Sequence, residues 1–268
     1  MIEKKIINKL FDQKNIDKKD VKYIESIVNN LDNGTIRVCE KKDKKWITHE
    51  WIKKSILLYF KIQKTQTIEV GPLEFCDKIP LKKGFKKKHI RSVPLAIVRH
   101  GSFVNKNVIL MPSYVNIGAY IDTGTMIDTW ATIGSCAQIG KNVHISGGVG
   151  VGGVLEPLQA NPVIIEDNCF IGSRCVVVEG VQIKKEAVLG AGVILTQSTK
   201  IIDVTTKKET YHKGVIPERS VVIPGTYQKQ FNAGEFGVPC ALIIGKRKES
   251  TDKKTSLNQV LREFKIST

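Results

Sequence analysis

Aliphatic residues recur at every sixth position through the middle of the chain. A small or β-branched residue follows each of them four positions later, and Gly, Asn, Asp or Ser often follows one position later. A period of six fits neither an α-helix, at 3.6, nor a half-buried strand, at 2.0. It predicts a triangular solenoid in which each hexad is one short strand and a corner, and three hexads make one coil. The predicted inward positions are Ile97, Phe103, Ile109, Val115, Ile121, Ile127, Ile133, Ile139, Ile145 and Val151, then Ile165, Ile171, Val177, Ile183, Leu189, Leu195 and Ile201, with a last pair at Ile216 and Val222.

This hexapeptide repeat is typical of the left-handed parallel β-helix, a known exception to the right-handed crossover rule. The fold class is therefore mainly β, with a β-helix domain over residues 89–225. Two breaks interrupt the period. We expect 152–162 to bulge out as a loop and the polar segment 202–215 to form a hairpin or another excursion from the coils.

Residues 1–88 lack the hexad and have apolar residues at helical spacing, which predicts an all-helical N-terminal domain. Asp32-Asn33-Gly34 is a plausible helix end, and Thr48 is a candidate cap for a helix that contains Trp51. Trp46 and Trp51 are expected to pack this domain together, and a short strand and a basic linker are expected over 61–90.

A small C-terminal extension is predicted over residues 226–268. Its apolar segment 240–246 predicts a strand, and the pattern over 255–264 predicts a helix.

The net charge of +16 comes mainly from lysines near the two ends, while the hexad region is close to neutral. A nucleic-acid binder usually concentrates arginine and aromatic residues on one face, so we expect no nucleic-acid partner. The apolar runs are too short for a membrane span and the N-terminus does not resemble a secretory signal, so the expected location is cytoplasmic and no membrane partner is expected. The six cysteines form no CxxC pair, and we expect small buried thiols and no metal site.

Hexad β-helices serve several functions, and the fold alone does not choose among them. A carbonic anhydrase of this fold needs three zinc-binding histidines, whereas only His100 and His144 lie within the regular hexads. A nucleotidyltransferase needs a glycine-rich phosphate-binding start in a preceding α/β domain, which the sequence lacks. An acyltransferase and a purely structural subunit remain.

Residues 110–172, from LMPSYVNIGAY through IDTWATIGSCAQIGKNVHISGGVGVGGVLEPLQANP to IIEDNCFIG, resemble the tetrahydrodipicolinate N-succinyltransferase family almost residue for residue. The resemblance extends over essentially the whole chain. It implies transfer of a succinyl group from succinyl-CoA, as co-substrate, to the amine of ring-opened tetrahydrodipicolinate in diaminopimelate and lysine biosynthesis. It also implies a homotrimer with active sites between neighbouring β-helices, and no permanently bound cofactor.

Such chemistry requires a proton acceptor for the amine, donors for the thioester oxyanion and cations for carboxylates. Asp128 in IDTWA is the catalytic candidate and also a substrate-binding one. In the alternative, Asp128 is a turn residue that only caps local backbone N–H groups, and Asp122 is another of that kind. Arg91 lies where the family has a carboxylate-binding arginine. Arg174, the only arginine of the second hexad block, is a second candidate, unless it only pairs with Glu179.

Ser146, Gly147 and Gly148 begin a glycine-rich stretch that could let the pantetheine arm of CoA lie close to the backbone, or could serve corner geometry alone. His144 is a rival proton acceptor, and Trp130 either shapes a pocket or packs at a subunit contact.

One position departs from the family pattern. Val176 stands where the family has a carboxylate, so that role either passes to Glu179, itself a substrate-binding candidate, or is lost. The alternatives to the succinyltransferase are a β-helix acetyltransferase acting on another amine and a non-enzymatic trimeric scaffold.

Overall fold

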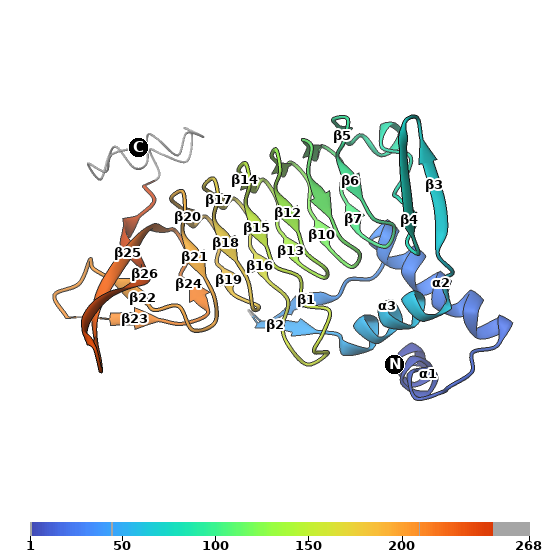
Figure 1. Cartoon of the computed structure of the whole chain (residues 1–268), viewed down its shortest axis with the longest axis horizontal. Helices are drawn as coiled ribbons and strands as arrows, with labels where there is room; N and C mark the ends of the chain where they lie inside the picture. Colours follow the sequence, from blue (N-terminus) through green and yellow to red (C-terminus); the bar gives the residue numbers. More distant parts are fainter. Residues whose placement is uncertain (1, 44, 209, 249–268) are drawn as a thin grey trace.

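The coils of the solenoid stack along the long axis of the molecule, between helices at one end and a long hairpin at the other (Figure 1). The computed structural model describes residues 2–43, 45–208 and 210–248. Strands of successive coils pair in parallel, so the prism has three faces, and the left-handed parallel β-helix predicted from the hexads is confirmed.

Each face is a stack of two-residue strands, one from each coil. The first face consists of β7 (Phe103–Val104), β10 (Tyr120–Ile121), β13 (Gln138–Ile139), β16 (Ile164–Ile165), β19 (Gln182–Ile183) and β24 (Val215–Ile216). The second face consists of β5 (Arg91–Ser92), β8 (Ile109–Leu110), β11 (Met126–Ile127), β14 (His144–Ile145), β17 (Phe170–Ile171), β20 (Val188–Leu189) and the start of β25 (Ser220–Phe231). The third face consists of β6 (Ile97–Val98), β9 (Tyr114–Val115), β12 (Thr132–Ile133), β15 (Gly150–Val151), β18 (Val176–Val177) and β21 (Ile194–Leu195).

The predicted inward positions are correct from Val115 onward, and one residue off before it. Leu110 is fully buried and aligns with Ile127, whereas Ile109 is half-buried and aligns with the outward residue Met126. Val98 and Val104 are likewise the buried members of their strands. Val115 comes only five positions after Leu110 instead of six, so the first full coil is one residue shorter than an eighteen-residue repeat. An apolar residue at both strand positions hid this shift from the periodicity.

The core of the prism is an unbroken column of aliphatic side chains, and the small residues predicted near the corners are buried with them. Five of the six cysteines are buried thiols, as expected, but Cys76 is exposed. Burial raises the pKa of Cys175 to about 11 and that of Cys136 to about 12. These thiols pack as small apolar groups.

The N-terminal segment contains three helices: α1 (Ile2–Phe11), α2 (Lys18–Asn33) and α3 (Glu50–Ile62). The expected helix end is confirmed, since Gly34 takes the left-handed conformation and its N–H bonds to the carbonyl oxygen of Leu31. The expected cap at Thr48 is wrong: His49 precedes α3 without a side-chain cap, and the Thr48 hydroxyl donates to Asn161 Oδ1 at 2.9 Å.

The all-helical expectation for this segment is also wrong, because two antiparallel hairpins accompany the helices. One joins β1 (Cys39–Lys42) to β2 (Lys45–Thr48), and the other joins β3 (Gln66–Val70) to β4 (Leu73–Asp77). The strands of the first hairpin are short, largely exposed and rich in lysine, so they lack the alternating apolar signal that marks a strand. The second hairpin falls within 61–90, where the sequence predicts a short strand. A 3₁₀ turn, η1 (Lys86–Lys88), then leads into the coils.

The two interruptions of the hexad form structures outside the prism. The first, 152–163, is a loop, and N-terminal side chains bind it: Lys53 Nζ donates to the Ala160 carbonyl oxygen. The second contains β22 (Ile201–Asp203) and β23 (Thr210–His212), the predicted hairpin.

The described chain ends with β26 (Gly234–Lys246), which contains the predicted strand 240–246 and pairs antiparallel with β25. The domain boundary predicted at residue 225 falls inside β25, and the helix predicted over 255–264 lies outside the described residues. None of the helices in the described ranges has the length and apolar character needed to cross a membrane.

Candidate active site

Most of the predicted site residues meet at one edge of the prism, where the chain turns from the second face to the third. Successive coils place Asp128-Thr129-Trp130, Ser146-Gly147-Gly148 and Gly172-Ser173-Arg174 at this second–third edge. Backbone hydrogen bonds hold the stack: Gly148 N donates to the Thr129 oxygen at 2.8 Å, and Arg174 N to the Gly147 oxygen at 3.1 Å. Adjacent coils lie about 4.8 Å apart, so these residues are within reach of one ligand.

One carboxylate oxygen of Asp128 is held in place by local hydrogen bonds. Oδ1 accepts from the backbone N–H of Thr129 at 2.7 Å and from its hydroxyl at 3.3 Å. No other group of the described chain binds the carboxylate, so Oδ2 stays open. The capping role considered from the sequence is therefore present, and it leaves one oxygen for chemistry.

Glycine at position 148 makes room for Arg174. Gly148 has a φ of +67°, and a Cβ there would lie 2.7 Å from Arg174 Cδ and 2.8 Å from its Nε. The arginine side chain thus lies across the glycine of the preceding coil. No carboxylate of the described chain pairs with Arg174, so the alternative in which Arg174 pairs with Glu179 has no support in the structure.

The backbone N–H of Gly147 has no acceptor among the described residues, whereas the corresponding N–H of Thr129 is satisfied by Asp128. Ser146, its neighbour, is 5% exposed. The edge therefore offers an open carboxylate oxygen, an unused backbone donor and a guanidinium within two coil spacings.

His144 approaches the same edge from the second face. Its ring stacks on Phe170 at a centroid distance of 4.8 Å. Burial lowers the pKa of His144, and the negative charge of Asp128 opposes that shift. The imidazole is therefore held neutral near neutral pH, next to the carboxylate.

The remaining predicted residues lie elsewhere. Arg91 is exposed on β5, on the second face, where β8 alone separates it from the strand that leads into Asp128. Glu179 lies at the third–first edge, and its Oε2 accepts from Gln197 N at 3.1 Å. Val176 is half-buried on the third face between Gly150 and Ile194. Within one chain, Glu179 does not reach the position that Val176 occupies.

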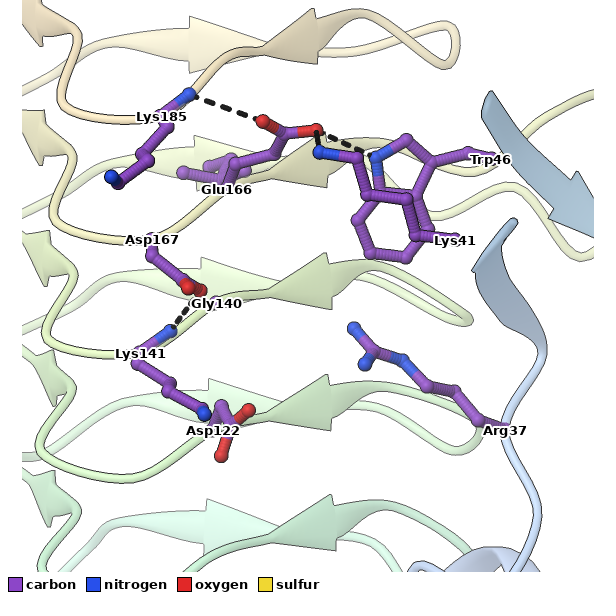
Figure 2. Close-up of a pocket in the computed structure, with 10 residues that line it drawn as sticks. Arg37, Lys41, Trp46, Asp122, Gly140, Lys141, Glu166, Asp167 and Lys185 are labelled. Carbon is purple, nitrogen blue, oxygen red and sulfur yellow. Dashed lines mark hydrogen bonds and ion pairs between the residues drawn. The ribbon is translucent and has the colours of Figure 1, made fainter. Parts of the chain in front are cut away.

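The sequence did not indicate a second polar hollow, which lies between the β1–β2 hairpin and the first face (Figure 2). It measures about 310 Å³, and its lining includes Arg37, Trp46 and Glu166. The indole N–H of Trp46 donates to Glu166 Oε1 at 2.8 Å, so Trp46 binds a polar partner as well as packing with the helices. Because these residues come from segments more than a hundred positions apart, no local spacing could indicate the hollow.

Known proteins resemble this chain over most of its length. Residues 3–62 match the model of the tetrahydrodipicolinate N-succinyltransferase N-terminal region, and residues 162–197 match that of the hexapeptide repeat of succinyl-transferase. A Bordetella pertussis protein named 2,3,4,5-tetrahydropyridine-2,6-dicarboxylate N-succinyltransferase is 54% identical over 245 residues, covering 89% of this chain and 88% of its own. A Buchnera aphidicola protein of the same name is 52% identical over 273 residues, covering 97% of this chain and 98% of its own.

The chain belongs to the tetrahydropyridine-dicarboxylate N-succinyltransferase family. The family predicted from the central segment is thereby confirmed, and with it an acyltransferase rather than a scaffold. A solved Campylobacter jejuni structure, provisionally described as a 2,3,4,5-tetrahydropyridine-2-carboxylate N-succinyltransferase, superposes with a TM-score of 0.52 at 17% identity, covering 83% of this chain and 62% of that one. At that identity, the likeness to this succinyltransferase supports the fold alone.

Proposed function

We propose that the protein transfers the succinyl group of succinyl-CoA to the amine of ring-opened L-2,3,4,5-tetrahydrodipicolinate. The product is N-succinyl-L-2-amino-6-oxopimelate, an intermediate on the way to diaminopimelate and lysine, made in the cytoplasm. The observation that carries this proposal is the grouping of Asp128, the Gly147 N–H and Arg174 at the second–third edge. These are a proton acceptor, an oxyanion donor and a carboxylate-binding cation, the three groups that the reaction needs.

In the proposed reaction the amine nitrogen attacks the thioester carbon, a C–N bond forms and the C–S bond breaks. The open Oδ2 of Asp128 holds the attacking amine and accepts its proton, and the thiolate of CoA leaves and is protonated. The N–H of Gly147 donates to the oxyanion of the tetrahedral intermediate. His144 is the second candidate for the proton, because its lowered pKa keeps the ring nitrogen unprotonated near neutral pH.

Cations on both sides of this centre provide binding for carboxylates. Arg174 lies one coil beyond Ser146–Gly148, and Arg91 lies on the second face in the direction of the N-terminal coils. A planar guanidinium binds a carboxylate with two parallel hydrogen bonds. We assign a substrate carboxylate to Arg91 and either a second one or the succinyl carboxylate to Arg174. Ser146, Gly147 and Gly148 line the path of the pantetheine arm.

The proposed active unit is a homotrimer in which a neighbouring β-helix covers this edge. Trp130 supports this arrangement, because its side chain is 68% exposed next to Asp128 in the isolated chain. Glu179 lies at another edge of the prism. It can therefore bind substrate at this edge only if it belongs to a neighbouring chain. Light scattering should give about 90 kDa, three times the 29.9 kDa of one chain, and about 30 kDa would contradict the trimer.

Thiol release from succinyl-CoA and from acetyl-CoA, each with and without tetrahydrodipicolinate, tests the reaction. Rapid release only with succinyl-CoA and the acceptor is expected, and Asp128→Asn should reduce kcat/KM by about 10²–10⁴-fold, the usual contribution of a general base. Asp203→Asn is the matched control, because that carboxylate also accepts from a following threonine N–H and hydroxyl, but on the β22–β23 hairpin. Preference for acetyl-CoA would favour the acetyltransferase alternative, and no release with either donor would refute the enzyme.

A further inference from the structure

The hollow between the β1–β2 hairpin and the first face contains a guanidinium, that of Arg37, whose two terminal amino groups have no acceptor among the described residues. Arg37 is fixed by its Nε, which donates to Gln138 Oε1 at 2.6 Å, and by its position over the Tyr120 ring, with Cζ 3.7 Å from the centroid. Gln138 is itself fully buried and oriented by a bond to the Cys136 carbonyl oxygen. No acceptor in the described chain binds either terminal amino group of Arg37, and no described carboxylate lies within ion-pair distance of it.

The carboxylate of Glu166, which also lines the hollow, is already paired. Glu166 is 8% exposed, and its Oε1 accepts from Lys41 Nζ and from Trp46 Nε1, both at 2.8 Å. Its Oε2 accepts from Lys185 N at 3.2 Å. Glu166 thus joins the hairpin to the coils, and both of its oxygens are bonded to groups other than Arg37 (Figure 2).

Two carboxylates on the opposite wall each have one unused oxygen. Asp122 Oδ1 accepts from Asn105 Nδ2 and Thr123 N, both at 2.7 Å, and Asp167 Oδ1 accepts from Lys141 N at 2.8 Å. The second oxygen of each has no donor among the described residues. Figure 2 places both carboxylates on the coils, across the hollow from Arg37, which lies two residues before β1.

We propose that this hollow binds a small α-amino acid in its zwitterionic form. Arg37 takes the carboxylate with its two free amino groups, and Asp122 and Asp167 take the ammonium. A ligand with two carboxylates and no ammonium would place its second carboxylate beside those two acidic groups. The side chain of the ligand lies against Trp46 and Ile165, which also line the hollow. Its volume of about 310 Å³ is at the lower end of the range for small-molecule sites.

This site is separate from the proposed active site. It lies on the first face beside the first–second edge, so the whole second face separates it from Asp128. Because its ligand bridges the N-terminal hairpin and three successive coils, binding should stabilise their contact and raise the melting temperature of the protein.

Calorimetric titration of the full chain with three probes of equal chain length tests the proposal without turnover. L-norleucine carries both charges, hexanoate only the carboxylate and hexylamine only the ammonium. We expect L-norleucine to bind at least about tenfold more tightly than either, since one charge-assisted hydrogen bond accounts for such a factor. Equal binding of hexanoate and L-norleucine would overturn the assignment of the ammonium, and no binding of any probe would overturn the site.

Variants separate the two halves of the proposed site. Arg37→Lys keeps the charge but loses the fork, and should weaken L-norleucine binding by about tenfold or more. Asp122→Asn should weaken L-norleucine binding and leave hexanoate binding unchanged or tighter. Arg99→Lys is the matched control, an arginine beside Phe60 outside the hollow, and should bind as wild type does. Asp128→Asn should also bind normally; loss of binding there would contradict a separate site.

Discussion

The carboxylate of Asp32 joins the C-terminal end of α2 to the first coil, and its removal should destabilise the whole protein. Its Oδ1 lies 2.6 Å from Lys82 Nζ and 3.3 Å from His100 Nδ1, and accepts from Gly101 N at 3.0 Å. The Lys82 side chain is 1% exposed and also donates to two carbonyl oxygens. Burial alone would raise the pKa of Asp32, but hydrogen bonds from His100 and Lys82 hold it well below its usual range.

Asp32→Asn preserves the shape and the acceptor for Gly101 but leaves the Lys82 ammonium buried without a countercharge. Breaking one side of a buried pair costs about 3–5 kcal/mol. We expect that loss in the free energy of unfolding, measured by urea denaturation at pH 7 and one protein concentration. The double variant Asp32→Asn, Lys82→Met should recover most of it, because it leaves no charge to compensate.

The pH dependence of the free energy of unfolding provides an independent test. Burial lowers the pKa of Lys82 to about 8, below its unfolded value, so the unfolded chain binds more protons between about pH 8 and 10.4. Stability from this group therefore rises with pH across that window, and in Asp32→Asn the rise should begin at lower pH. Lys88→Met is the control: its ammonium is 3.5 Å from Asp32 Oδ2 and 39% exposed, so the change should cost less than about 1 kcal/mol. A loss below about 1 kcal/mol in Asp32→Asn, or a double variant as unstable as the single one, would refute the reasoning.

Three further predictions concern the coils. Leu110→Ala should cost about 2–5 kcal/mol in urea denaturation and Ile109→Ala clearly less, since only Leu110 points inward; the reverse order would contradict the register reported above. Gly134→Ala should lower the melting temperature by several degrees in calorimetry, because its Cβ would meet the backbone of Gly152 and Gly153 in the next coil, while Gly150→Ala, with open space, should not; equal melting temperatures would contradict that contact. His144 should titrate below 6.5 by NMR, and lower still in Asp128→Asn, because the carboxylate charge raises its pKa; an unchanged value would mean that the two groups do not interact.

The repeat made the fold predictable, because each hexad carries its own signal for an inward side chain and a corner. The same redundancy concealed one detail. At Ile109-Leu110 both strand positions are aliphatic, so the pattern could not reveal that the first full coil lacks one residue. The β1–β2 hairpin also escaped prediction, since exposed lysines and glutamate on two four-residue strands give no periodicity.

The site was predictable only in part, for a similar reason. Asp128 and Ser146 occupy the same hexad position in adjacent coils, so correct counting places them together. Glu179 lies three residues beyond Val176, which carries it past the third face to another edge. Arg37 was missed altogether, because its partners, Tyr120 and Gln138, are brought to it only when the N-terminal segment packs against the first face.

The identity of the product tests the central claim most directly. The purified protein should be incubated with tetrahydrodipicolinate and succinyl-CoA that is uniformly ¹³C-labelled in its succinyl group, and the mixture analysed by mass spectrometry. The label should appear in N-succinyl-2-amino-6-oxopimelate in step with the release of CoA thiol. Label found only in free succinate or unreacted thioester would contradict the assignment of this edge as a succinyl-transfer site.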